Sequence, residues 1–144
     1  MGASAPFTMI NETLTARDIY LTALALTFTN EANAQDFRTF FLSFLNLCCQ
    51  EALDTENSIR HAYNDTNPAT PMPILTAAPV YSDFDAVVGY HDVIVRAALP
   101  YGVASYYFQD DMDDWRYAEH RGRFVSALKE ASKARFSTVE VIYG

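Results

Sequence analysis

Leu99-Pro100-Tyr101-Gly102-Val103-Ala104 opens the stretch that decides the fold of this chain. Three aromatic residues follow at positions 106–108, and the stretch closes with the acidic run Asp110-Asp111-Met112-Asp113-Asp114. Apolar residues at helical spacing before such a run predict a helix that ends in a turn. Acidic side chains also favour the positive end of a helix dipole, so the same run predicts the start of another helix. The stretch therefore predicts two packed helices joined by an acidic turn.

Pro100 leaves two interpretations of the first of these helices open. Either the helix begins within residues 85–92 and is kinked at Pro100, or it begins at Leu99 with Pro100 in its first turn. In both cases it ends near Gln109, and Gly102 allows a neighbouring helix to approach closely. The second helix is expected from Asp113 to about Phe136. Its expected apolar contacts are Trp115, Tyr117, Phe124, Leu128 and Ala131.

Two further helices are expected before this pair. Thr15, with Asp18 three residues later, resembles an N-cap that opens a helix ending near Thr29. A longer helix follows from Ala34 to about Ala62, because apolar residues recur there at three- and four-residue spacing. The residues that form this stripe are Phe37, Phe40, Phe41, Phe44, Leu45, Cys48 and Leu53.

The remaining segments lack a helical pattern. Four prolines between residues 63 and 85 predict a long Pro-rich loop between the second and third helices. Residues 1–14 are expected to form a flexible N-terminal arm, and residues 137–144 a short extended tail. The predicted fold is therefore mainly α, a four-helix bundle-like domain over residues 15–136 with a strand-like tail.

The charge of the chain is acidic overall but uneven. The net charge is −8 at pH 7, which disfavours nonspecific binding to nucleic acid. Residues 116–144 depart from this balance, with six basic and three acidic side chains. Arg116, Arg121, Arg123 and Lys129 therefore define a possible partner-facing basic helix. The alternative is a solvated helix face whose positive charge favours the negative end of the helix dipole.

The residue types that carry catalysis are present, but their spacing predicts no catalytic residue, no metal site and no cofactor. Cys48 falls on the Phe-rich face, where burial raises the pKa of a thiol and makes it inert. His61, His91 and His120 are too widely spaced for a helical ligand pair, so surface or capping roles are expected. The acidic run lacks the central glycine of an EF-hand loop. It is expected to cap a helix, with loose binding of a divalent cation as the alternative.

The chain carries no pattern for export or membrane insertion. No positive segment followed by an apolar run opens it, and the uncharged stretches 19–30 and 39–50 are too short to span a bilayer. Cys48 and Cys49 are adjacent, which does not favour a disulfide between them. We therefore expect a soluble protein synthesised in a reducing cytoplasm, with no membrane partner.

The closing residues predict a docking segment. Val139, Val141 and Tyr143 alternate with Glu140 and Ile142, a strand-like pattern with no long second strand to pair with. An unpaired strand edge is a liability unless a partner covers it. The expected partner-binding residues are Thr138, Val139, Glu140, Val141, Ile142 and Tyr143. The alternative is a frayed terminus packed on its own helices.

Taken together, these features resemble the small head–tail connector, or adaptor, proteins of tailed bacteriophages and gene transfer agents. The resemblance covers residues 15–144. It rests on the opening of the first helix at 15–20, the aromatic second helix and the Pro-rich loop. It also rests on 98–104, the acidic turn, Trp115-Arg116-Tyr117-Ala118 and the closing Glu140-Val141-Ile142-Tyr143-Gly144.

The resemblance implies a structural virion protein without catalysis. Members of this family form homo-oligomeric rings, commonly dodecameric, below the portal protein of a DNA-filled head. Such a ring extends the DNA channel, lets DNA pass without sequence-specific binding, and offers a platform for a stopper, tail-terminator or tail protein. The segment 138–143 matches the position that docks to the portal or to a neighbouring subunit. The implied location is the neck of the virion, after assembly in the host cytoplasm.

Two other functional classes stay open from the sequence. One is a tail terminator or another component of the neck. The other is a small helical enzyme or regulator from outside any virion, which loose binding of a metal by the acidic run would favour.

Overall fold

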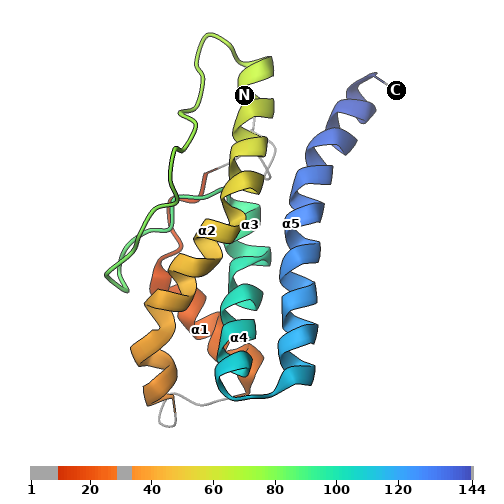
Figure 1. Cartoon of the computed structure of the whole chain (residues 1–144). Coiled ribbons are helices and arrows are strands. Elements are labelled where there is room, and N and C mark those ends of the chain that lie inside the picture. The colour runs from red at the N-terminus through yellow and green to blue at the C-terminus, as the bar shows by residue number, and fades with distance from the viewer. Residues whose placement is uncertain (1–9, 29–33, 144) are drawn as a thin grey trace.

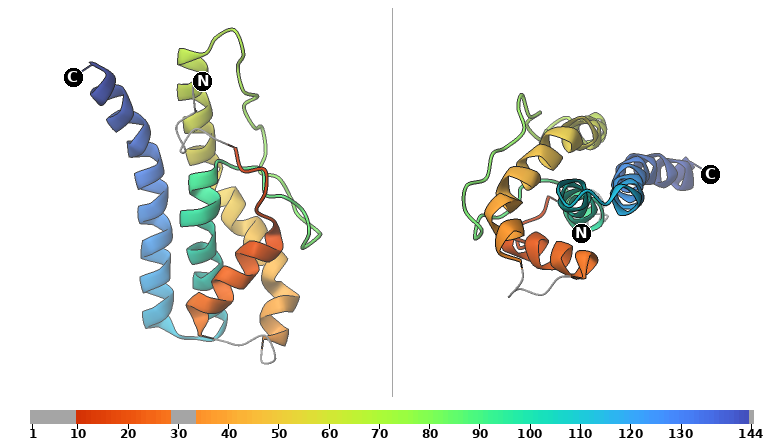
Figure 2. Two further views of the ribbon diagram at one scale, coloured as in Figure 1. Left: turned by 180° about the vertical axis from the view of Figure 1, so that it is seen from behind. Right: turned by 60° about the horizontal axis from the view of Figure 1, so that its bottom comes forward.

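The structure, a computed structural model, describes residues 10–28 and 34–143, with side chains up to residue 133. Within this part the chain forms helices and no sheet, so the predicted mainly helical fold is confirmed. The helices are α1 (Ala16–Thr27), α2 (Gln35–Thr66), α3 (Asp92–Ala97), α4 (Leu99–Asp110) and α5 (Asp114–Tyr143). The α4 helix lies in the middle, with α1 and α2 on one side and α5 on the other (Figures 1 and 2).

The first helix begins at the predicted N-cap. The Thr15 hydroxyl accepts a hydrogen bond from the backbone N–H of Asp18, and the Asp18 carboxylate accepts one from the backbone N–H of Thr15 at 2.9 Å. This reciprocal arrangement satisfies two N–H groups that the first helical turn leaves without partners. The helix ends at Thr27, where Phe28 adopts a left-handed backbone conformation with a φ of 56°.

The segment before α1 is attached to the bundle. The backbone N–H of Asn11 donates to the carbonyl of Tyr90 at 2.8 Å, and the Asn11 side chain donates to the carbonyl of Val88 at 2.8 Å. The Val88 N–H donates in turn to the carbonyl of Leu14. Residues 10–14 therefore do not belong to a free arm, since one buried asparagine ties them to the segment before α3. Residues 1–9 of the expected arm lie outside the described residues.

The second helix buries the face that its sequence predicts. Phe37, Phe41, Leu45 and Cys48 are all buried against the rest of the bundle, whereas Phe40 is half exposed. The helix continues through residues 63–66, beyond the predicted end at Ala62. It stops at Thr66 because Asn67 precedes a proline, and a residue in that position is disfavoured in the α conformation.

The irregular segment 67–91 descends along α2 and is held there by three asparagines of that helix. The amide of Asn64 pairs with Met72, that of Asn57 with Leu75, and that of Asn46 with Tyr81. Each amide donates to the backbone carbonyl of its partner and accepts from the backbone N–H of the same residue, at distances of 2.6–3.0 Å. This is the pairing that a neighbouring strand would provide. We call these three contacts the asparagine ladder.

The third predicted helix is divided in two. The α3 helix ends at Ala97, and α4 begins at Leu99 with Pro100 in its first turn, so the second interpretation of Pro100 describes α4 correctly. Proline is well tolerated there because its missing N–H is one that the first turn leaves unpaired. The predicted close approach at Gly102 is also confirmed. A Cβ atom at Gly102 would lie 2.7 Å from Cys48 Sγ and 2.8 Å from a ring carbon of Phe124.

The last helix is longer than predicted. It follows the acidic turn, where Asp113 Oδ1 accepts from the backbone N–H of Arg116 at 3.1 Å, so the predicted capping role is confirmed for Asp113. Its backbone stays helical to Tyr143, and the predicted strand-like conformation of residues 137–143 is therefore wrong. The physical reason is that extending an existing helix adds one hydrogen bond per residue, whereas the β preference of Val and Ile depends on a partner strand.

Substitution of alanine for Gly102 and for Gly122, both in helices, should have opposite effects on stability. Gly102→Ala forces a Cβ against Cys48 and Phe124, and we expect a loss of about 1–3 kcal/mol of unfolding free energy. Gly122→Ala is the matched control, because a Cβ there meets nothing within 4 Å and alanine is the better helix former. It should stabilise the protein by about 0.5–1 kcal/mol. Urea unfolding followed by circular dichroism measures both, and equal effects would contradict the close packing at Gly102.

Candidate partner-binding surfaces

The predicted docking segment forms the final turns of α5. Its residues are Thr138, Val139, Glu140, Val141, Ile142 and Tyr143. In Figures 1 and 2 this end of α5 leans away from α2, at the end of the bundle opposite the acidic turn. The side chains of these residues lie outside the described ones, so their role in docking stays a prediction.

The predicted basic residues do not form one surface. Arg116 and Arg123 lie on one side of α5, where each makes an ion-pair contact of 3.7 Å, with Asp113 and Glu119 respectively. Their guanidinium groups also lie over the rings of Phe108 and Tyr101. Arg121 turns inward toward α2, and Lys129 is exposed on another side of the helix. The spacing of these residues along the sequence places them on different sides of the helix, so they do not form a single basic face.

Arg121 joins three helices instead. It donates to both carboxylate oxygens of Glu51 on α2, and the Tyr106 hydroxyl of α4 donates to Glu51 Oε1 at 2.8 Å. The same guanidinium lies 5.5 Å from the ring centroid of Tyr106 and 5.0 Å from that of Phe124. Cation–π and ion-pair contacts that share one guanidinium fix its orientation. This predicted partner-facing residue therefore serves the packing of α5 on the bundle.

The two thiols are buried in the core. Burial, together with the neighbouring thiol, raises the pKa of Cys48 far above its ordinary value. Burial and the nearby carboxylate of Glu56 raise the pKa of Cys49 to about 12. A thiol is a nucleophile only as its thiolate, so both groups are inert at neutral pH. The predicted inertness of Cys48 agrees with these surroundings.

A buried polar network surrounds Glu56. Its Oε2 atom lies 2.7 Å from Nδ1 of His91 and 2.6 Å from Nε of Arg60, and its Oε1 accepts from the backbone N–H of His91 at 2.7 Å. Burial raises the pKa of a carboxyl, but the hydrogen bonds and charge of His91, with the hydrogen bond from Arg60, outweigh it here. The pKa of Glu56 is therefore held below its usual range, and the group is ionised in the folded protein.

The polar network around Glu56 stabilises the fold and is closed to solvent. His91 is completely buried, with one ring nitrogen held by Glu56 and the other sealed from solvent. Arg60 donates onward to the carbonyls of Pro73 and Gly89, at 2.8 and 3.2 Å. The carboxylate thus ties α2 to the irregular segment and to the start of α3. The expectation of a surface or capping role is wrong for the side chain of His91, and also for that of His120, which is buried beside Phe108.

A shallow depression of about 330 Å³ lies between α1, the start of α2 and the irregular segment. It is lined by Arg17, Tyr20, Arg38 and Phe84. The Arg17 guanidinium lies 5.5 Å from the Phe84 ring centroid, and its Nη2 atom lies 3.1 Å from the Asp85 carboxylate. Asp85 therefore balances the charge of Arg17 at the edge of this depression.

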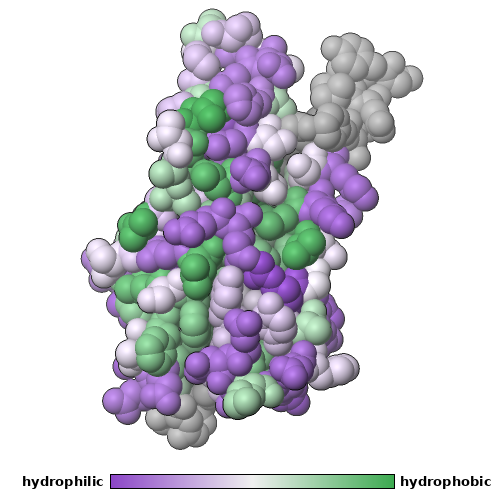
Figure 3. Space-filling model, viewed as in Figure 1, coloured by the Kyte–Doolittle hydropathy of each residue, from purple (hydrophilic) through white to green (hydrophobic). Residues whose placement is uncertain are grey.

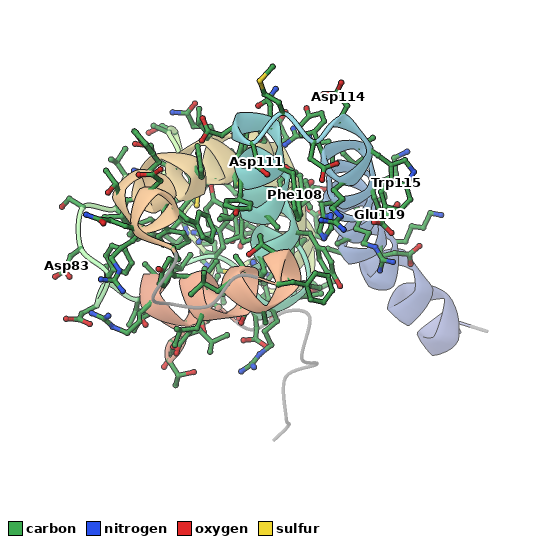
Figure 4. The ribbon with its side chains drawn as sticks, turned by 90° about the horizontal axis from the view of Figure 1, so that it is seen from below. Asp83, Phe108, Asp111, Asp114, Trp115 and Glu119 are labelled. Carbon is green, nitrogen blue, oxygen red and sulfur yellow. The ribbon has the colours of Figure 1, made fainter. Side chains whose placement is uncertain are left out.

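Large apolar side chains reach the surface on α1, α2 and α5, on the irregular segment and at the turn between α4 and α5. They include Phe40 and Leu47 of α2, Met112 of the turn, and Trp115 and Val125 of α5. The prediction that Trp115 makes core contacts is therefore wrong. Viewed from below, Trp115 lies at the α5 edge of the bundle and Asp83 at the opposite edge (Figure 4). Over the face seen in Figure 3, hydrophobic groups alternate with hydrophilic ones.

Three comparisons with known proteins give no match. No protein-family model, no curated protein and no solved structure matches it. Among the described residues, no three His, Cys, Asp or Glu side chains converge as a metal site would require. None of the helices in the described part is long and apolar enough to cross a membrane.

Two features of these surroundings were not predicted from the sequence. Glu56 falls on the same helical face as Cys49, Ala52 and Ile59, and an acid on an otherwise apolar face signals a buried partner. The asparagine ladder has a weaker signal. Asn46, Asn57 and Asn64 recur at intervals that return to one side of the helix, but amides at such spacing are also common on solvated faces.

We expect Glu56→Gln to destabilise the protein by about 3–5 kcal/mol at pH 7, because it leaves Arg60 buried without a counter-ion. A carboxyl with a lowered pKa contributes stability above its unfolded pKa, and this contribution disappears as pH falls through its folded pKa. The difference between the two proteins should therefore shrink below about pH 4. Exposed Glu119→Gln is the control and should change stability by less than about 0.5 kcal/mol. Unfolding curves of both proteins at pH 7 and pH 3 test this prediction. The same difference in unfolding free energy at both pH values would contradict the role of Glu56 as an ionised buried carboxylate.

Proposed function

We propose that the chain is a structural virion protein, a head–tail connector subunit that forms a homo-oligomeric ring below the portal. The ring would extend the DNA channel and join the head to a stopper, tail-terminator or tail protein. The proposal takes its first support from the sequence resemblance described above. The mainly helical fold is compatible with it.

The observation that carries the proposal is the division of roles between interior and surface. The thiols, the Glu56 carboxylate and the His91 ring are held inside the bundle, where they make structural contacts. The surface of two long helices instead displays large apolar side chains such as Phe40 and Trp115. Exposed apolar groups that adjoin one another on a surface are typical of a site that a neighbouring protein covers.

The charge of the chain suits a DNA channel. With a net charge of −8, the protein repels phosphate groups, so DNA would slide past it without being retained. The four-helix bundle-like domain would form the wall of the ring, and the segment 138–143 would dock on the portal or on a neighbouring subunit. The protein would be assembled in the host cytoplasm and located in the neck of the particle.

Electron microscopy of a producer strain that lacks this chain tests the proposal. We expect filled or leaking heads beside free, complete tails, because the joint between them is missing. A plasmid-borne copy should restore joined particles. Intact tailed particles in normal numbers without the chain would overturn the proposal and leave the enzyme or regulator class in its place.

The docking segment has a separate test in the same strain. A chain truncated before residue 137 lacks the last turns of α5. It should still fold, since the core contacts of α5 end with Ala131 among the described residues. We expect this chain to melt as a folded protein but to be absent from purified particles. Its normal incorporation would contradict the docking role of residues 138–143 without bearing on the rest of the proposal.

A further inference from the structure

The side of α2 that faces away from the core carries a regular stripe. The stripe is defined by Asp36, Phe40, Ser43, Leu47 and Asp54, all of them exposed. Intervals of three, four and seven residues place these positions on one face of a helix. Phe40 and Leu47 are 49% and 43% exposed, and as neighbours on one helix face they form a patch rather than scattered apolar residues. The charged members of this α2 stripe are both acidic.

The outer side of α5 carries a stripe of opposite charge. It is defined by Trp115, Ala118, Gly122, Val125 and Lys129, again at three- and four-residue intervals and all exposed. Trp115 is 72% and Val125 40% exposed. A Cβ atom at Gly122 would meet nothing within 4 Å, so no packing within this chain requires a glycine there. The charged member of this α5 stripe is basic, and exposed Lys133 extends it by one turn.

The two stripes match in height along the bundle. Both helices begin at the same end of the molecule and run in the same direction (Figures 1 and 2). Each helix rises about 1.5 Å per residue, so positions equally far from the two starts lie at similar heights. Phe40 and Leu47 are therefore level with the small residues Ala118 and Gly122 and with Val125. Higher up, Asp54 is level with Lys133, and Lys129 lies about one turn below them.

Charge favours contact between unlike helices over contact between like ones. The α2 helix carries five acidic and two basic residues, whereas α5 carries six basic and four acidic ones. In the described part of the chain, neither Asp54 nor Lys129 forms an ion pair. Two α2 stripes facing each other would bring acids together, and two α5 stripes would bring lysines together.

We propose that the α2 stripe of one copy packs in parallel against the α5 stripe of the next copy. This inference rests on the proposed ring and names the surface through which its subunits join. Phe40 and Leu47 fill the groove that Ala118 and Gly122 leave open, as large residues fill the holes between small ones in packed helices. Asp54 pairs with Lys129 and Lys133. Because the two stripes lie on different sides of the molecule, the contact is heterologous, the kind that forms a ring when the rotation between copies closes.

Sedimentation velocity of the purified full chain over a range of concentrations tests this contact. We expect concentration-dependent association that Gly122→Gln weakens at least about tenfold, the effect of losing a central interface contact. Because a Cβ atom at Gly122 would meet nothing within 4 Å and glycine is a poor helix former, this variant should fold at least as stably as the wild type. Ala25→Gln on exposed α1 is the matched control and should associate like the wild type.

A charge exchange separates this contact from other modes of association. Asp54→Lys alone and the pair Lys129→Asp and Lys133→Asp alone should each weaken association, and combining them should restore it. Association that ignores Gly122→Gln and all charge variants would overturn the contact but leave a ring through other surfaces possible. A wild type that stays monomeric throughout would overturn the contact as well. Neither result depends on the particles seen in the strain lacking the chain, which test the proposed function by themselves.

Discussion

The carboxylate of Glu56 is the interaction on which the rest of the structure depends. It is ionised, buried and shared between Arg60 and both the backbone and the ring of His91. Through Arg60 it also reaches two carbonyls of the irregular segment. A carboxylate in the interior is tolerable only when its oxygens are fully satisfied, so this geometry is demanding. It fixes where α3 begins, and thereby how α4 returns through the centre of the bundle.

Much of the fold follows from local rules that the sequence displays. Thr15 and Asp18 form a capping box because both partners lie within one turn. The aromatic face of α2 is buried because its spacing leaves no other stripe apolar enough to cover the core. Pro100 is accommodated in the first turn of α4 for a reason that concerns only its own missing N–H. Each of these features depends on residues close together along the chain.

The features that escaped prediction depend on residues far apart along it. Glu56 and His91 are separated by 35 positions, and no local pattern around either residue indicates that the two are in contact. The apolar character of Trp115 predicts a place in the core, but its position on α5 leaves the side chain exposed. The strand-like pattern at 137–143 failed for a related reason, since a β preference has no effect without a second strand. The α2 and α5 stripes were not predicted either, because their complementary charges become apparent only when the positions of the two helices are compared.

The asparagine ladder has a consequence for how the chain folds. Its rungs join residues 8, 18 and 35 positions apart, and the shortest lies next to the end of α2. Once Asn64 holds Met72, the next rung has to close only the few residues that remain between them, and the same holds for the third. The entropy of closing a loop grows with the length left free, so each rung lowers the cost of the following one. The irregular segment can thus attach to α2 stepwise, from the C-terminal end of the helix toward its N-terminal end. It does not have to close as one long loop.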